Sequence, residues 1–205
     1  MIKLFDWDGT IVNSDEFYYT FLKRICQAHN KNCPFNTQEE RRQFLQQNQF
    51  MRAYLLAGFK ETDFPMIYDE FRKYSKETSV PLINGMLPVL LTHGRAIVSH
   101  CDAQAIMFQL EKQGVNGRIK VYGQENKEQG LIACIQENNM SQFAYVTDFA
   151  GDARIVHRVS SVLGIEAITI GVSWGSDTDE ALYEAGAEYV AATPQGLELH
   201  LRTIT

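Results

Sequence analysis

Hydrophobic positions divide the chain into a segment of helices and a longer segment in which strands and helices alternate. The chain opens with an apolar run ending at Asp6, which predicts a short buried strand. Residues 15–79 carry hydrophobic side chains at helical spacing, and we expect no strand there. From Gly85 onward, the alternation of strands and helices predicts a parallel sheet with right-handed crossovers and helices on both faces.

Three helices are expected within residues 15–79. The first begins after Ser14, which can cap it, and ends before Pro34. The second runs from 37 to about 58 and opens with the Thr-x-x-Glu spacing of a capping box. The third covers 63 to about 76. We therefore expect a helical domain over 15–79, inserted into a core formed by 1–14 and 80–205.

Within the second part of the core, the pattern predicts five strands and five helices. The strands lie at 95–98, 118–122, 143–146, 166–170 and 188–191. The helices lie at 102–113, 127–138, 153–163, 179–185 and from about 195.

Two carboxylates, Asp6 and Asp8, stand at the carboxyl end of the first predicted strand. In open α/β sheets this end of a strand is where ligands bind. Carboxylates placed so close together repel, and the pKa of one rises unless a cation lies between them. The pair therefore indicates a divalent cation, a shared proton, or both, while an ordinary acidic turn after a strand is the alternative.

Composition narrows the class of protein. Hydrophobic residues make up 45% and charged residues 21% of the chain, as in ordinary globular proteins. No apolar run approaches the roughly 18 residues of a membrane span. A strand that begins at once leaves no room for a signal peptide, so we expect a cytoplasmic protein. The four cysteines have no metal-ligand spacing and are expected to be reduced thiols.

The net charge of −6 argues against nucleic acid as the main partner. Residues 16–79 have ten Lys and Arg against eight Asp and Glu, whereas the remainder has nine against 17. An acidic core beside a mildly basic insert suits a metal-dependent site for an anionic substrate. The simpler alternative is that most of these basic side chains only solvate exposed helix faces.

The first strand leads into Asp6-Trp7-Asp8-Gly9-Thr10-Ile11-Val12-Asn13-Ser14. This stretch resembles the first motif of the haloacid dehalogenase-like (HAD) hydrolases, Asp-x-Asp-Gly-Thr followed by two hydrophobic residues and Asp-Ser; only Asn13 departs from it. The resemblance implies that Asp6 is the nucleophile and becomes an aspartyl-phosphate, and that Asp8 is the general acid and base. It also implies phosphate contacts for Gly9 and Thr10, and phosphate rather than organohalide chemistry.

The second and third motifs of that family are matched by Ser99 and Lys127. Ser99 follows a predicted strand, and its hydroxyl with the free N–H groups ahead of the next helix can bind a phosphate oxygen. The next residue, often Asn in the family, is His100, which contacts the substrate or caps the helix. Lys127 begins a predicted helix, lacks the usual Pro-x-Pro after it, and would offset the phosphoryl charge. Lys120 is the competing candidate.

Residues 147–152 resemble the fourth motif, Gly-Asp-x-x-x-Asp, with Thr147 in place of Gly. The resemblance implies that Asp148 ligates Mg²⁺ and that Asp152 holds either a metal-bound water or the motif lysine. The expected metal site thus comprises Asp6, Asp8, Asp148 and Asp152, with Asp8 contributing its backbone carbonyl. An acidic turn that caps the next helix is the alternative.

Segments 171–175 and 184–190 resemble the tail of the phosphoglycolate phosphatase-like branch, and are expected to close the sheet edge and shape a loop near the site. The resemblance implies a Rossmann-like α/β core with an inserted all-helical (C1-type) cap. It further implies a Mg²⁺-dependent phosphatase for a small phosphorylated metabolite, acting as monomer or homodimer without nucleic-acid or membrane partners. Three insert residues are candidates for contacting a second anionic group of the substrate: Arg41, Arg42 and Arg52.

Three alternatives stay open at this point. A phosphomutase of the same branch would share all four motifs. A phosphonatase would need an insert lysine for a Schiff base, for which Lys23 is the candidate. A binding or regulatory module with weak turnover is consistent with the departures at Asn13, His100 and Thr147 and after Lys127.

Overall fold

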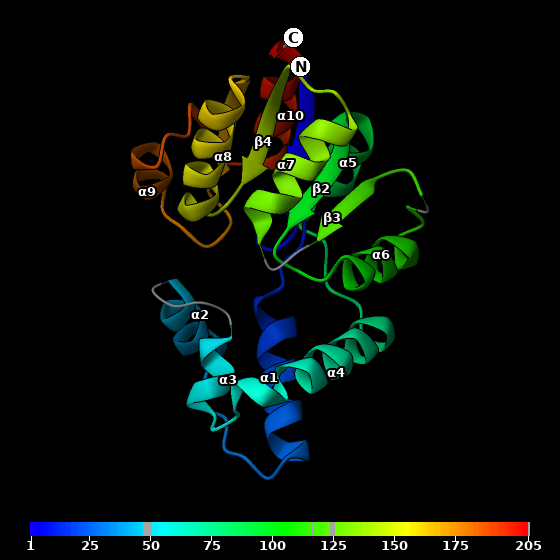
Figure 1. Ribbon diagram of the computed structural model, residues 1–205, viewed down its shortest axis with the longest axis vertical. Coiled ribbons are helices and arrows are strands. Elements are labelled where there is room, and N and C mark those ends of the chain that lie inside the picture. The colour runs from blue at the N-terminus through cyan, green and yellow to red at the C-terminus, as the bar shows by residue number, and fades with distance from the viewer. Residues whose placement is uncertain (47–50, 116, 124–125, 205) are drawn as a thin grey trace. The chain divides into compact units, whose positions relative to one another are not determined.

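The computed structural model describes residues 1–46, 51–115, 117–123 and 126–204. The chain divides into two compact units. The first comprises Met1–Asn13 with Pro81–Thr205, and the second comprises Ser14–Val80 (Figure 1). Among the described residues, no helix is long and apolar enough to cross a lipid bilayer.

The second unit is helical throughout its described part. Its elements are α1 (Asp15–Ala28), α2 (Gln38–Gln46), α3 (Arg52–Leu56), the short 3₁₀ helix η1 (Glu61–Asp63) and α4 (Phe64–Glu77). The helix expected from 37 to about 58 includes residues 47–50, which lie outside the described residues. Helices α1 and α4 pack through aromatic rings: the ring centroid of Phe17 lies 4.8 Å from that of Tyr74, and that of Phe21 lies 5.2 Å from that of Phe71.

The predicted helix caps of this unit form only in part. Ser14 occupies the N-cap position of α1, but its side chain makes no capping hydrogen bond. At α2, the Glu40 N–H donates to Thr37 Oγ1 at 3.1 Å, as expected for a capping box. The Glu40 carboxylate instead accepts from the N–H of Asn36 at 2.7 Å, one residue earlier than the box requires.

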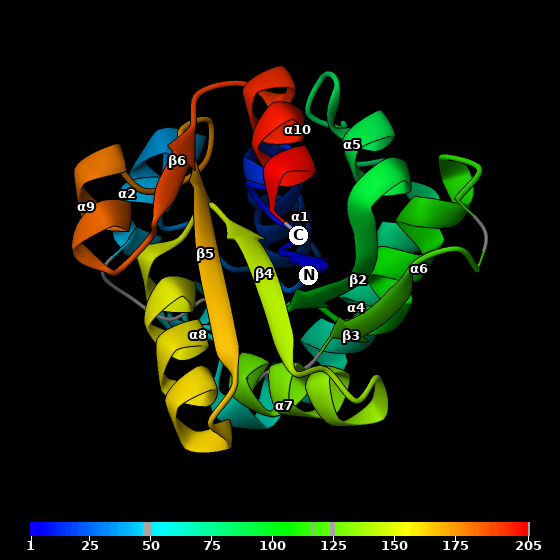
Figure 2. The same ribbon diagram turned by 90° about the horizontal axis from the view of Figure 1, so that it is seen from above.

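The first unit contains one six-stranded sheet in which every pairing is parallel. Its strands are β1 (Ile2–Phe5), β2 (Gly94–Ser99), β3 (Lys120–Gly123), β4 (Gln142–Thr147), β5 (Glu166–Val172) and β6 (Tyr189–Ala191). They lie in the order β3-β2-β1-β4-β5-β6 (Figures 1 and 2). The order reverses between β1 and β4, which confirms the expected Rossmann-like α/β fold.

Helices cover both faces of this sheet. They are α5 (Met86–His93), α6 (Ala103–Lys112), α7 (Lys127–Glu137), α8 (Ala150–Leu163), α9 (Asp179–Glu184) and α10 (Pro194–Thr203). Helices α7 and α8 lie on one face, and α5 and α10 on the other (Figure 2). The predicted strands and helices of this unit are present, with small shifts at their ends.

Helix α5 is the element that the sequence pattern did not predict. Its first six residues form a continuous apolar run without helical alternation, and this run includes Pro88. Proline is tolerated here because it stands in the first turn of the helix, where its missing N–H has no partner to lose. Gly85 precedes the helix with φ of 90°, a left-handed conformation that glycine adopts without strain.

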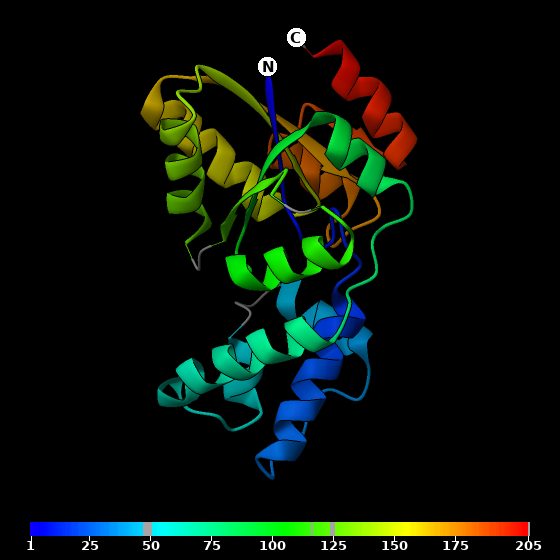
Figure 3. The ribbon, with the colours of Figure 1, turned by 90° about the vertical axis from the view of Figure 1, so that its right-hand side faces the viewer.

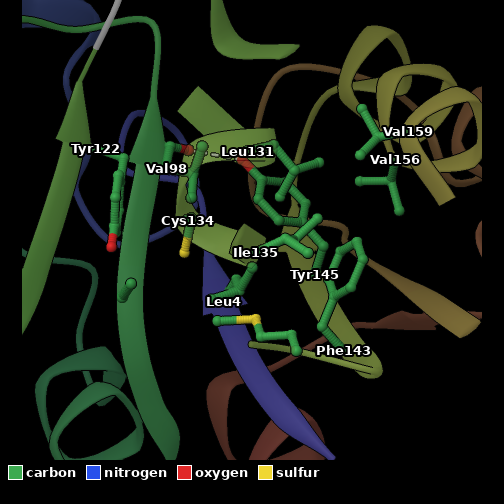
Figure 4. Close-up of a cluster of buried hydrophobic side chains, with 12 residues drawn as sticks. Leu4, Val98, Tyr122, Leu131, Cys134, Ile135, Phe143, Tyr145, Val156 and Val159 are labelled. Carbon is green, nitrogen blue, oxygen red and sulfur yellow. Dashed lines mark hydrogen bonds between the residues drawn. The ribbon is translucent and has the colours of Figure 1, made fainter. Parts of the chain in front are cut away.

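The hydrophobic core on the α7 and α8 face follows the period of the strands. Alternate residues point to this face, as Phe143 and Tyr145 of β4 do (Figure 4). They meet Leu131 of α7 and Val156 of α8. The buried Tyr145 hydroxyl donates to the carbonyl of Val98 at 2.7 Å, which ties β4 to a strand that is not its neighbour.

We expect Phe143→Ala to destabilise the protein by about 3–5 kcal/mol, because Phe143 is fully buried and the smaller side chain leaves a cavity. Chemical denaturation followed by circular dichroism measures the change. Val162→Ala is the matched control, since Val162 is 73% exposed, and it should change stability by no more than about 0.5 kcal/mol. Equal effects of the two substitutions would contradict this description of the core.

Candidate active site

The site lies where β1 and β4 run side by side and end. Phe5 is paired with Val146, and the N–H of Asp6 donates to the carbonyl of Val146 at 2.8 Å. Asp6 and Asp148 therefore leave the sheet at the same edge, directly after neighbouring parallel strands. This is the position at which the strand order reverses, and such positions hold the ligand sites of doubly wound folds.

Lys127 connects three elements at this edge. It is the first residue of α7, its side chain is 3% exposed, and its Nζ lies 2.8 Å from Asp6 Oδ1. The same Nζ donates to Asp152 Oδ2 at 2.5 Å, from the first turn of α8. Thr147 Oγ1 also donates to this Asp152 oxygen, at 2.9 Å. The end of β1 and the starts of α7 and α8 are thus joined through one buried ammonium group.

The buried charges shift each other's pKa values. Burial raises the pKa of Asp6 well above its ordinary value, and the negative charges of Asp152 and Asp148 act in the same direction, against the attraction of Lys127. Burial acts to lower the pKa of Lys127, but the nearby carboxylates of Asp152 and Asp6 outweigh it and raise this pKa. Lys127 is therefore held as an ammonium ion at neutral pH.

Asp148 is oriented by neutral donors. Thr10 Oγ1 donates to its Oδ1 at 3.0 Å, and the N–H of Ser176 donates to its Oδ2 at 2.8 Å. Burial raises the pKa of Asp148 to about 6, although both hydrogen bonds act to lower it. Two glycines make room for this side chain: a Cβ added at Gly9 would lie 2.0 Å from Asp148 Oδ2, and one added at Gly175 would lie 2.0 Å from Asp148 Cβ.

The site has an excess of buried negative charge. Asp6, Asp148 and Asp152 are buried carboxylates, and Lys127 is the buried cation beside them among the described residues. Asp152 Oδ1 makes no hydrogen bond in the described part of the chain, and Asp6 Oδ1 is the oxygen that faces Lys127 Nζ at 2.8 Å. When the carboxylates are ionised, the group is short of two positive charges and offers oxygen ligands, which fits one divalent cation.

No three His, Cys, Asp or Glu side chains in the described part of the chain form a ready-made metal site. Mg²⁺ is usually held by one or two carboxylates together with water and substrate phosphate rather than by a full set of protein ligands. Asp152 Oδ2 is already engaged by Lys127 and Thr147, so Asp152 is placed to support the lysine.

The other residues predicted for the site lie at the same edge of the sheet or in the first loop. Ser99 ends β2 and is buried, and its Oγ accepts from the N–H of Cys101 at 3.1 Å. His100 is exposed, with Nε2 4.0 Å from Asp152 Oδ1. Asp8 is half-buried and forms an isolated bridge with Val12.

Lys120, the alternative to Lys127, lies elsewhere. It begins β3, at the amino end of the sheet, and pairs with Glu137. The four basic candidates of residues 15–79 all belong to the second unit: Lys23, Arg41, Arg42 and Arg52. In that unit the buried Arg41 lies over the ring of Tyr18 at 5.3 Å, and Arg42 approaches Asp15 at 3.9 Å.

Sequence reasoning missed the loop that follows β5 as a source of direct contacts. Its Ser176 contributes a backbone N–H, which no side-chain pattern can reveal. Its Asp177 accepts from the N–H of Ala150 at 2.7 Å and so caps α8 from outside. Trp174 of the same loop donates its Nε1–H to the carbonyl of Thr10 at 3.1 Å. The Gly-Ser-Asp run at 175–177 is a turn signal that pointed to this loop.

Comparisons with known proteins agree with this geometry. Residues 3–147 match the sequence profile of the haloacid dehalogenase-like hydrolases. A predicted phosphatase from Clostridium acetobutylicum is similar in structure, with a TM-score of 0.77 and 18% identity over 99% of this chain and 98% of that one. No curated protein sequence matches the chain significantly.

Two further solved structures resemble the chain. A putative phosphoglycolate phosphatase from Lactobacillus plantarum has a TM-score of 0.70 and 13% identity, covering 98% of each chain. A putative beta-phosphoglucomutase from Bacteroides vulgatus has a TM-score of 0.67 and 14% identity, over 98% of this chain and 87% of that one. At such identities the likeness establishes the fold alone. Because the family profile spans well over half of the chain, however, the protein belongs to the haloacid dehalogenase-like hydrolases.

Proposed function

We propose that this protein is a Mg²⁺-dependent phosphatase that hydrolyses a small phosphorylated metabolite through an aspartyl-phosphate on Asp6. The observation that carries the proposal is the excess of buried carboxylates over buried cations where β1 and β4 end. A nucleophilic carboxylate, a fixed ammonium group and a site suited to a divalent cation are the components that phosphoryl transfer requires.

The reaction follows from the residues in order. A carboxylate oxygen of Asp6 attacks the phosphorus atom, the bond to the leaving oxygen breaks, and Asp8 donates a proton to that oxygen. In the second half Asp8 takes a proton from the water that attacks the phosphoaspartate, which releases phosphate and restores Asp6. Lys127 offsets the charge of the phosphoryl group throughout, and Asp152 keeps Lys127 in place.

We assign the metal to the carboxylates of Asp6 and Asp148, with the backbone carbonyl of Asp8 as a third protein ligand. When bound, Mg²⁺ would neutralise charge on the transferring phosphoryl group. Thr10 and Ser176 hold the Asp148 carboxylate in orientation for this role. Ser99, with His100 and the backbone of Gly9 and Thr10, is assigned to the phosphate oxygens.

The second unit is proposed to act as a cap that presents specificity residues and excludes bulk water during the reaction. Its basic candidates Arg41, Arg42 and Arg52 would contact a second anionic group of the substrate. Nothing in the described contacts of Lys23, which lies over the ring of Tyr19 at 5.2 Å, favours a Schiff base.

Asp6→Asn should abolish turnover of p-nitrophenyl phosphate in the presence of Mg²⁺, because an amide cannot form the aspartyl-phosphate. Release of p-nitrophenol measures the loss, and mass spectrometry of acid-quenched enzyme should locate a phosphoryl group on Asp6 of the parent protein alone. Asp8→Asn is the companion variant: it keeps Asp6 and should lose on the order of 10²–10⁴-fold in rate.

Turnover in Asp6→Asn equal to that of the parent would refute the nucleophile assignment. An inactive parent would instead support the binding-module alternative. Free phosphate released from a metabolite that the enzyme accepts distinguishes hydrolysis from a mutase reaction, which would return a sugar-phosphate isomer.

Mg²⁺ should raise the melting temperature of the parent by roughly 5–10 °C at a concentration 100-fold above its Kd. Asp148→Asn should remove the increase, because the amide keeps the shape of the side chain but not its charge. Differential scanning fluorimetry with and without EDTA measures both. An undiminished shift in Asp148→Asn would contradict the ligand assignment.

The stabilising effect of Mg²⁺ should also depend on pH, through the protonation of Asp148. Burial raises the pKa of Asp148 to about 6 from 3.8, so between these values the folded protein keeps a proton that the unfolded chain has released. In the absence of metal, stability due to this group therefore falls as the pH rises from about 4 to about 6. Mg²⁺ needs the ionised carboxylate, so its stabilising effect should be larger at about pH 7 than at about pH 5.

Gly175→Ala should impair metal binding without changing any proposed ligand. The new Cβ would lie 2.0 Å from Asp148 Cβ, so the loop or the carboxylate must move, at a cost of about 1–3 kcal/mol. We expect the Mg²⁺-induced melting shift to shrink or disappear. In the matched control Gly196→Ala, the nearest atom is Thr193 Oγ1 at 3.4 Å, and the shift should persist. Equal shifts in both variants would show that Asp148 is not confined as described.

A further inference from the structure

A second group of basic side chains lies at the opposite end of the sheet from Asp6. Strand β3 is an edge strand of the sheet (Figure 3). Its first residue, Lys120, is paired with Ala96, next to Arg95 of β2. A cavity of about 460 Å³ lies beside these strand starts. Its lining includes Arg95, Met107, Arg118, Ile119, Lys120 and Asn138. This volume is within the usual range for small-molecule sites.

This pocket is lined by positive charges, although its unit carries a net negative charge. The first unit contains nine Lys and Arg against sixteen Asp and Glu. This cavity is lined by three of those nine cations: Arg95, Arg118 and Lys120. A concentration of positive charge within an acidic unit raises the local concentration of anions.

The three cations differ in how they are compensated. Lys120 pairs with Glu137, and its ammonium lies 5.0 Å from the centre of the Tyr122 ring. Neither Arg95 nor Arg118 has an ion-pair partner within the described ranges. Two guanidinium groups are therefore available to an anion, and their planar donor geometry suits the oxygens of phosphate or phosphonate.

One wall of the pocket is fixed by a hydrogen-bond network. The Tyr122 hydroxyl donates to Glu137 Oε2 at 2.9 Å, and Asn138 Nδ2 donates to the Tyr122 oxygen at 3.1 Å. Asn138 Nδ2 also donates to the carbonyl of Cys134 at 2.7 Å. Because Asn138 lines the cavity, the pocket has an ordered polar wall before any ligand enters.

The pocket also has an apolar side. Met107 of α6 is 49% exposed, and Ile119 lies next to Arg118 and Lys120 in the chain. We propose that this pocket is a second ligand site, which binds a small phosphate- or phosphonate-type anion that carries an apolar group. The site lies at the amino ends of β2 and β3, so it does not depend on the proposed reaction at their carboxyl ends.

Phenylphosphonate is a suitable probe, because it is an anion with an apolar ring and has no phosphate ester to hydrolyse. Isothermal titration calorimetry in EDTA, at mildly alkaline pH, measures its binding to the full chain. The double variant Arg95→Gln/Arg118→Gln should bind about tenfold more weakly or worse, since it loses charge-assisted hydrogen bonds. Methylphosphonate, which lacks the ring, should bind the parent more weakly than phenylphosphonate does.

Arg154→Gln is the matched control, because Arg154 is exposed on α8 and has no ion-pair partner in the described part of the chain. It should leave the affinity for phenylphosphonate unchanged. A loss of affinity equal to that of the double variant would show that only the net charge of the protein matters, which would contradict the proposal. Backbone amide resonances of residues 117–121 should shift with the probe. No binding by the parent, equal binding by the double variant, or shifts confined to the surroundings of Asp6 would each overturn the proposal.

Discussion

The structure of the sheet edge depends on one buried ammonium group held between two carboxylates. Taking ions out of water costs several kcal/mol each, and only close opposite charges offset that cost. Lys127 meets this condition by lying within 2.8 Å of Asp6 and 2.5 Å of Asp152. If Lys127 were absent, Asp6 and Asp152 would be left as buried negative charges without the cation that compensates them. The end of β1 and the starts of α7 and α8 are therefore held together by electrostatics as well as by the apolar core.

The two carboxylates at the ends of β1 and β4 have different kinds of hydrogen-bonding and charged partners. Asp6 faces a fixed cation, whereas Asp148 is oriented by a hydroxyl and a backbone N–H that add no net charge. Asp148 thus keeps its negative charge available, and burial makes that charge costly, as its raised pKa records. A divalent cation held by these carboxylates would supply positive charge and so relieve this cost at Asp148. The excess of negative charge therefore comes from the burial of three carboxylates beside one ammonium group, and not from any single residue.

The sequence predicted the parts of this arrangement that depend on side-chain type and period. The strand and helix pattern, together with polar residues directly after strands, brought Asp6, Ser99 and Asp148 to one edge of the sheet. Contacts made by backbone atoms left no such trace, and the N–H of Ser176 is the main example. Close packing leaves no sequence pattern either. Glycine is needed at 175 because the side chain of Asp148, 27 positions earlier, leaves no room for a Cβ there. Helix α5 was missed because an unbroken apolar run has no period from which to infer a helix.

Two of the four departures from the family motifs, Thr147 and the sequence after Lys127, are accompanied by local hydrogen bonds. Thr147, in place of the usual glycine, donates its hydroxyl hydrogen to Asp152 and accepts from the N–H of Phe149 at 3.1 Å. Thr147 thereby helps to hold the Asp152 carboxylate beside Lys127.

Lys127 lacks the prolines that usually follow it, but its helix is capped by Asn126, whose side chain accepts from the N–H of Gln129 at 3.3 Å. The lysine is therefore still presented at a well-defined helix start. At these two departures, therefore, the structure still holds the ammonium group of Lys127 beside Asp6 and Asp152.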